Sequence, residues 1–233
     1  MDIPTRPGVT QRFLLLTPPE AKAAVILFAG GHGGLDIQDD GRFGWGGGNF
    51  LVRSRDLFAQ QGLVVAVIDK PSDLAGLSGQ RQTAQHVADV RAVMRWLRAQ
   101  YQLPVWLVGT SRGTQSAAYV ATALAGDADS PDGLVLTSTI LTDSKDRPVP
   151  AMALDRLALP VLVVHHEKDG CEHCRPSELA ALMDKLPGTL RKDLVMFSGG
   201  VTRGDPCGAY AYHGFNGIEQ DVVGRIGAWI VSR

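Results

Sequence analysis

Short runs of apolar residues recur along the chain, separated by longer stretches of helical periodicity. The runs are continuous rather than alternating with polar residues, which is typical of strands covered on both faces of a sheet. An earlier segment, residues 11–16, is expected to form an antiparallel strand at the sheet edge. The other runs cover residues 25–29, 64–68, 105–108, 134–137, 161–164 and 194–197.

Helical patterns lie between these runs. Apolar residues from Val87 to Tyr101 form one stripe, which predicts a helix beginning at about Thr83. Asn49 is of a type that caps helices, and the pattern after it predicts one helix ending near Gln61. Further helical patterns cover residues 117–124, 176–186 and 216–230, the last with Asn216 and Glu219 as its expected capping pair.

This alternation of strands and helices predicts the α/β class, with a mostly parallel central sheet and helices on both faces. No composition break, linker or repeat divides the sequence, so we expect a single domain over residues 1–233. Residues 140–159 are the only stretch with room for a lid. Because that stretch is short, we expect a minimal cap or none.

Composition narrows the classes of partner. The net charge is −1 with Lys and Arg dispersed, which argues against nucleic acid or a membrane surface as partner. No apolar run is long enough to span a bilayer, and residues 1–6 lack the pattern of a signal peptide. The localisation stays open between the cytoplasm and, if a signal was trimmed, the periplasm or exterior. The oligomeric state also stays open.

The most informative motif is Gly109-Thr110-Ser111-Arg112-Gly113, a G-x-S-x-G pattern. It directly follows the expected strand at 105–108 and precedes a helical pattern, the context in which this motif forms a nucleophile elbow. Here the sequence resembles the α/β-hydrolase superfamily, and the resemblance covers nearly the whole chain. It implies that Ser111 is the nucleophile and that the main-chain N–H of Arg112 helps to form the oxyanion hole.

The resemblance also implies the chain order Ser, then acid, then His. The acid is expected after the strand at 161–164, where Asp169 is followed by Gly170. Glu167 is the closest competitor for this role. Asp143 follows the preceding strand, a position used in some superfamily members, and is less favoured.

The base is expected between the last strand and the last helix. His213 is the histidine found there, so it is the predicted general base. His165 and His166 end the strand that precedes Asp169, and they are candidates for orienting it. His86 lies in a helical pattern and is expected to be a surface or packing residue.

Two glycine-rich stretches follow the first long strand. Residues 30–34, Gly-Gly-His-Gly-Gly, resemble the superfamily's oxyanion loop, with Gly31 or His32 as main-chain donor. They match neither the P-loop nor the dinucleotide fingerprint, which disfavours a phosphate site. Phe43 and Trp45, in the loop that follows, would then line the substrate pocket. A surface loop without such a role is the equal alternative.

Three cysteines lie in the last third of the chain, Cys171, Cys174 and Cys207. If Asp169 and His213 meet, the loops that carry Cys171 and Cys207 lie side by side. Loops of this form resemble those of a lidless bacterial branch of the superfamily. The resemblance favours a Cys171–Cys207 disulfide, which would tie the acid loop to the base loop. A Cys174–Cys207 bridge and three free thiols are the alternatives.

A metal site is the weaker interpretation of this region. Its histidines and cysteines are clustered, but their spacing matches no familiar zinc motif and there is no second C-x-x-C. We therefore expect no metal ligands, and a thioredoxin-like role is less favoured still. The clustered residues are His165, His166, Cys171, His173 and Cys174.

Together these features predict a serine hydrolase that cleaves an ester-like bond of a small-molecule acyl substrate through an acyl-enzyme, without a cofactor. The same fold also supports acyltransferases, peptidases and lyases. A non-catalytic binding protein is the remaining alternative. The complete set of Ser, Asp and His argues against it.

Overall fold

The computed structural model, which describes residues 1–232, has one eight-stranded sheet in the order β1-β2-β4-β3-β5-β6-β7-β8. β1 and β2 run antiparallel to their neighbours, and all the other pairs are parallel. The predicted mostly parallel sheet is therefore confirmed. The strands are β1 (Asp2–Arg6), β2 (Val9–Leu16), β3 (Ala23–Phe28), β4 (Leu63–Pro71), β5 (Val105–Thr110), β6 (Gly133–Thr137), β7 (Val161–His166) and β8 (Lys192–Phe197).

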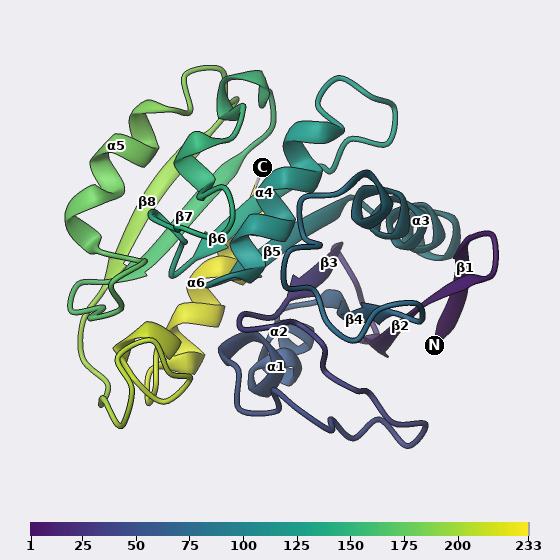
Figure 1. The fold of residues 1–233 in the computed structure, drawn as a ribbon, viewed down its shortest axis with the longest axis horizontal. Helices are drawn as coiled ribbons and strands as arrows, with labels where there is room; N and C mark the ends of the chain where they lie inside the picture. Colours follow the sequence, from purple (N-terminus) through teal and green to yellow (C-terminus); the bar gives the residue numbers. More distant parts are fainter. Residues whose placement is uncertain (233) are drawn as a thin grey trace.

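Helices cover both faces of the sheet, as predicted (Figure 1). One buried apolar cluster lies between the sheet and α3, α4 and α5, and a second lies between the sheet and α1, α2 and α6. The helices are α1 (Phe50–Arg53), α2 (Arg55–Gln60), α3 (Ala84–Tyr101), α4 (Gly113–Ala123), α5 (Leu179–Asp184) and α6 (Glu219–Val231), with 3-10 turns η1 (Val149–Ala151), η2 (Leu154–Arg156), η3 (Pro176–Glu178) and η4 (Tyr212–Gly214).

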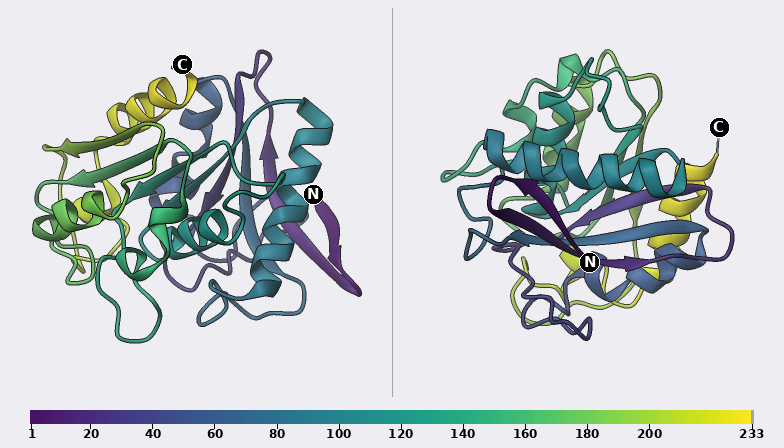
Figure 2. Two further views of the ribbon diagram at one scale, coloured as in Figure 1. Left: turned by 90° about the horizontal axis from the view of Figure 1, so that it is seen from above. Right: turned by 90° about the vertical axis from the view of Figure 1, so that its right-hand side faces the viewer.

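The sheet edge differs from the expectation. β2 pairs antiparallel with β4, as expected, but β1 pairs with residues 9–12 on its other side, so residues 11 and 12 are not at the edge, whereas residues 14–16 pair with β4 alone. β1 forms the outer strand at this side of the sheet, and the N-terminus lies beside it (Figures 1 and 2). β1 has no apolar run and contains Pro4, which an edge strand tolerates because one side needs no ladder hydrogen bond.

Two helix boundaries also differ. The segment after Asn49 forms α1 and α2 rather than one helix, because Ser54 leaves helical geometry at φ −95° and ψ 4°. At the start of α6 no side chain caps the helix. Glu219 instead pairs with Arg53, and the Asn216 amide donates to the carbonyls of Val201 and Tyr210.

The stretch with room for a lid belongs to the core. Leu141, Val149 and Leu154 are buried in the apolar cluster, where η1 and η2 contact α4 and η1 contacts α5, so this segment does not form a cap. Figure 2 shows the sheet and its flanking helices from two further directions.

No helix among residues 1–232 is both long and apolar enough to cross a bilayer.

Candidate active site

Ser111 lies at the sharp turn between β5 and α4. Its φ of 51° is a left-handed conformation that is unfavourable for a non-glycine residue, as expected of a nucleophile elbow. The turn is possible because glycines flank it. A Cβ on Gly113 would lie 2.0 Å from Phe28 O, and one on Gly109 would lie 2.5 Å from Gly113 O. The main-chain N–H of Ser111 donates to Thr137 O, which fixes the turn to β6.

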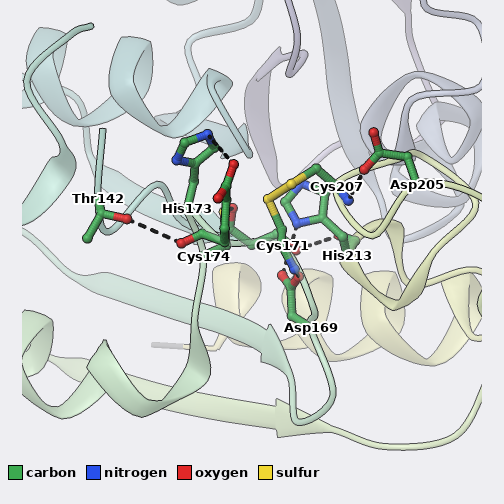
Figure 3. The surroundings of a disulfide bond; sticks show 10 residues. Thr142, Asp169, Cys171, His173, Cys174, Asp205, Cys207 and His213 are labelled. Carbon is green, nitrogen blue, oxygen red and sulfur yellow. Dashed lines mark hydrogen bonds and ion pairs between the residues drawn. A yellow bond between two sulfur atoms is a disulfide. The ribbon is translucent and has the colours of Figure 1, made fainter. Parts of the chain in front are cut away.

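His213 and Asp169 meet beside this turn. His213 Nδ1 lies 2.9 Å from Asp169 Oδ2, and both side chains are buried. Asp169 Oδ1 accepts a hydrogen bond from the Cys171 N–H over 2.9 Å. Figure 3 shows Asp169, Cys171 and His213 together. His213 Nε2 has no hydrogen-bond partner within residues 1–232, so this nitrogen is available to a nucleophile or a substrate.

The two competing acids lie elsewhere. Asp143 Oδ2 accepts hydrogen bonds from Arg112 over 2.6 Å and from Gln115 over 3.0 Å. Burial raises the pKa of Asp143, but the bonds from the Lys145 N–H, Arg112 and Gln115 outweigh it and leave the pKa below its usual value. Glu167 is exposed, and its main-chain N–H donates to Phe197 O. Of the three acids, Asp169 is the one hydrogen-bonded to His213.

A cavity of about 340 Å³ opens above Ser111 and His213. Its walls are largely glycine and apolar side chains, and none of the lining residues is acidic or basic except His213 itself. The walls come from the loops after β3, β5 and β8, which lie at one end of the sheet because these strands are parallel. The lining residues are Gly30, Gly31, Trp45, Gly46, Gly48, Asn49, Phe50, Thr110, Ser111, Cys207, Gly208, Ala209, His213 and Gly214.

The expected oxyanion loop borders this cavity. Gly31 lines it, whereas His32 is exposed and its ring lies 3.8 Å from that of Trp45. The main-chain N–H groups of Gly31, His32 and Arg112 have no main-chain acceptor within residues 1–232. These groups are therefore free to donate to a ligand.

A buried arginine holds the expected oxyanion loop in place. Arg81 donates to the carbonyls of Ala29 and Gly31 and to Ser116 Oγ on α4. Burial lowers the pKa of its guanidinium to about 9, and the nearby Arg112 contributes to this shift. Arg81 thus connects the loop after β3 to the helix that follows Ser111.

The loop after the glycines at 30–34 is also anchored. The Asp69 carboxylate accepts hydrogen bonds from the N–H groups of Leu35 and Ile37 over 2.6 and 2.7 Å. Trp45 lines the cavity, as expected for a substrate contact. Phe43 is not among the lining residues; its ring lies 5.3 Å from the Arg55 guanidinium.

Arg53 joins the two walls of the cavity. Its guanidinium donates to Gly48 O on one wall and to Ala209 O and Gly214 O on the other. Glu219 accepts two further hydrogen bonds from it over 2.9 and 3.0 Å. Because most of this side chain is shielded from solvent, we expect these charge-assisted hydrogen bonds to hold the walls together firmly.

The rings of His165 and His166 form no hydrogen bond with the Asp169 carboxylate within the described chain, but the Asp169 main-chain N–H donates to His166 O over 3.1 Å. His165 Nε2 accepts the Thr139 N–H over 2.6 Å, and burial lowers its pKa to about 3. The ring of His166 stacks on Tyr212 at 4.4 Å, next to His213. Its Nδ1 accepts the Lys168 N–H over 3.0 Å, so His166 contacts both the turn that carries Asp169 and the segment that carries His213.

The predicted disulfide is present between Cys171 and Cys207, with Cα atoms 4.5 Å apart (Figure 3). Cys174 is a buried free thiol, and burial raises its pKa. In residues 1–232, the side chains of Cys171, Cys174 and His213 form the group with metal-ligand geometry, with ligand atoms within 4.8 Å of one another. The disulfide removes the Cys171 thiolate from that set, so two ligands remain.

Several residues that shape the site were not identified by sequence reasoning. Arg81, Asp69 and Arg53 act through main-chain hydrogen bonds to distant loops, and no local motif surrounds them. Asn49 was identified as a helix cap alone, although its side chain also lines the cavity.

No protein-family model and no curated protein matches the sequence. Solved structures do match over almost the whole chain. A dienelactone hydrolase from Anabaena variabilis has 16% identity and a TM-score of 0.66, with 99% of this chain and 94% of that chain covered. A Pyrococcus furiosus esterase has 13% identity and a TM-score of 0.67, with 99% and 90% covered. A serine hydrolase without a lid from Xanthomonas campestris has 20% identity and a TM-score of 0.55, with 94% and 89% covered.

Proposed function

We propose that this chain, which has the α/β-hydrolase fold, is a serine hydrolase that cleaves an ester-like bond of a small-molecule substrate. The observation that carries the proposal is the contact of 2.9 Å between His213 Nδ1 and Asp169 Oδ2, with His213 Nε2 left free in a cavity that also contains Ser111. A hydroxyl is a weak nucleophile without a base, and an imidazole held by a carboxylate is a base suited to neutral pH.

In the first half of the proposed reaction, Ser111 Oγ attacks the substrate carbonyl carbon while His213 Nε2 takes the hydroxyl proton. The negative charge that develops on the carbonyl oxygen would be stabilised by the N–H groups of Arg112 and of Gly31 or His32. His213 then gives its proton to the leaving alkoxide, which departs as an alcohol, and Ser111 is left acylated.

In the second half, His213 Nε2 takes a proton from water, and the water oxygen attacks the acyl carbon. The Ser111 oxygen leaves with the proton returned by His213, which releases the carboxylic acid. Throughout the cycle, Asp169 holds His213 in the tautomer that carries its proton on Nδ1 and stabilises the imidazolium. Apart from the substrate and this water, the groups that these steps use are side chains and main-chain N–H groups of the chain.

The cavity indicates the kind of substrate. Its volume of about 340 Å³ is at the lower end of the range for ligand pockets, and no cationic side chain lines it. These features favour a small, uncharged acyl group. The esterases among the structural neighbours are consistent with a small-molecule ester as substrate.

The test combines an active-site label with ester hydrolysis. A fluorophosphonate should label the folded protein at the peptide that contains Ser111, and p-nitrophenyl acetate should be hydrolysed. The Ser111→Ala variant should lose both the label and at least about 10⁴-fold in kcat. Ser130→Ala, which changes a serine far from the cavity, is the matched control and should keep both activities. A Ser111→Ala variant that hydrolyses the ester at the original rate would contradict the proposal.

A further inference from the structure

We infer that Asn49 is an additional catalytic residue, whose side-chain amide donates a hydrogen bond to the oxygen of the reacting carbonyl. This inference rests on the proposed function, since it assigns a role within the same acyl-transfer reaction. The oxygen and the nitrogen of the Asn49 carboxamide have different surroundings.

The oxygen end of the Asn49 carboxamide has a structural partner. Asn49 is the N-cap of α1, and its Oδ1 accepts the N–H of Leu51 over 3.3 Å. A carboxamide is planar, so fixing the oxygen also fixes the direction of the nitrogen. The cap therefore determines which end of the amide points away from the helix.

The nitrogen end lies beside Gly30, which lines the cavity. Asn49 lines the same cavity as Ser111 and His213. A Cβ placed on Gly30 would lie 2.9 Å from Ser111 Cβ and 3.3 Å from Asn49 Nδ2, so both atoms flank the same glycine. Gly30 is the residue immediately before Gly31, one of the proposed main-chain donors to the oxyanion.

The Asn49 amide donates to no residue in the part of the chain that the structure describes. Its recorded hydrogen bond there is the one that Oδ1 accepts, which leaves both Nδ2 protons for a ligand. Asn49 brings the one carboxamide among the residues that line the cavity. A free amide donor placed beside the nucleophile is positioned to bind the oxygen that gains charge during attack.

The helix cap makes this donor rigid. Because Oδ1 already accepts a hydrogen bond, the side chain loses little conformational entropy when its amide donates to a ligand. Preorganised donors of this kind contribute most to the stabilisation of a transition state. The same cap allows the two roles of Asn49 to be separated by mutation. Serine and aspartate are both good N-cap residues, but neither carries an amide N–H.

The experiment compares Asn49→Ser, Asn49→Asp and Asn49→Ala with the wild type. For Asn49→Ser we expect an unchanged Tm, a KM within about threefold of the wild type and a kcat lowered by about 100-fold, the effect typical of removing one oxyanion donor. Asn49→Asp should lose at least as much kcat, since its carboxylate would repel the developing charge. Asn49→Ala should lose a similar factor in kcat and also about 2–4 °C in Tm, because it lacks the cap.

A second readout reports on the transition state directly. An alkyl boronic acid forms a tetrahedral adduct with a serine nucleophile, so its inhibition constant should rise about 100-fold in Asn49→Ser, in parallel with the loss of kcat. Thr83→Ala removes the N-cap bond of α3, in which Thr83 Oγ1 accepts the His86 N–H. This control should lower Tm without changing the inhibition constant.

The two proposals fail in different ways. If the wild type is neither labelled at Ser111 by a fluorophosphonate nor active on esters, the proposed function is wrong and the role of Asn49 is wrong with it. If the wild type is labelled and active, while Asn49→Ser and Asn49→Asp keep kcat and the boronic acid inhibition constant within about twofold, the assignment of Asn49 alone is overturned.

Discussion

The main-chain N–H of Cys171 donates to Asp169 Oδ1 over 2.9 Å, while the Cys171 sulfur is bonded to Cys207. The disulfide therefore begins at a residue that also holds the carboxylate facing His213. Its other end, Cys207, lines the cavity. One covalent link thus connects the loop of the proposed acid to the wall that carries the proposed base.

Removing this disulfide should reduce both stability and activity. The bond closes a loop of 36 residues, so Cys171→Ala with Cys207→Ala should lower the free energy of unfolding by about 2–4 kcal/mol. We also expect kcat to fall, because Asp169 would be held less firmly. Urea unfolding and ester kinetics measure the two effects.

A thiol count checks the bond itself. The denatured, unreduced wild type should react with one equivalent of a thiol reagent, through Cys174, and with three after reduction. Three reactive thiols before reduction would show that the bond does not form.

The identity of the acid can be tested with two neighbouring carboxylates. Asp169→Asn should lower kcat by about 10⁴-fold, because an amide favours the wrong tautomer of His213. Glu167→Gln is the matched control: this side chain is exposed and should leave kcat within about twofold. Steady-state kinetics on p-nitrophenyl acetate would decide between them, and a larger loss for Glu167→Gln would contradict the assignment of Asp169.

Two glycines give a contrast in stability. Gly113→Ala would place a Cβ 2.0 Å from Phe28 O, so we expect a loss of at least about 3 kcal/mol or failure to fold. Gly224 lies inside α6, and a Cβ there meets no atom within 4 Å. Gly224→Ala should therefore stabilise the protein by up to about 1 kcal/mol. Thermal unfolding compares the two, and equal effects would contradict the close approach at Gly113.

Buried histidines should make stability depend on pH. Burial lowers the pKa of His86 and of His165 to about 3 in the folded chain, against about 6.5 when unfolded. Between these values the unfolded state binds more protons, so the free energy of unfolding falls as the pH drops from 6.5 towards 3. Each histidine contributes a slope of up to about 1.4 kcal/mol per pH unit.

His86→Leu isolates one of these two contributions. Both ring nitrogens of His86 lack a partner in residues 1–232, so leucine loses no hydrogen bond there. We expect the variant to show a shallower decline of stability between pH 6.5 and pH 5 in urea unfolding. A slope equal to that of the wild type would contradict the burial of a neutral His86.

The sequence was sufficient to predict the structure where a local pattern is compatible with one kind of structure. Continuous apolar runs can be covered only inside a sheet with two faces, and the G-x-S-x-G glycines match a turn at which a Cβ would collide with backbone. The fold and the pairing of Cys171 with Cys207 followed from such constraints together with the family resemblance.

Other features depend on contacts between distant segments, which no local pattern encodes. Arg81 and Arg53 donate to carbonyls 50 and 161 residues away. β1 was not predicted, because this edge strand contains a proline and has no apolar run. Ser54 divides a helix whose periodicity continues across it. In each case tertiary contacts override the local propensity.

The Arg53 bridge across the cavity has a kinetic consequence. Both walls are attached to one largely shielded guanidinium, and the apolar residues of the segment that had room for a lid are packed into the core. Entry of the proposed ester substrate therefore requires no cover to swing open. Turnover should be limited by bond making and breaking at the proposed nucleophile, so kcat should change little when sucrose raises the viscosity of the solvent.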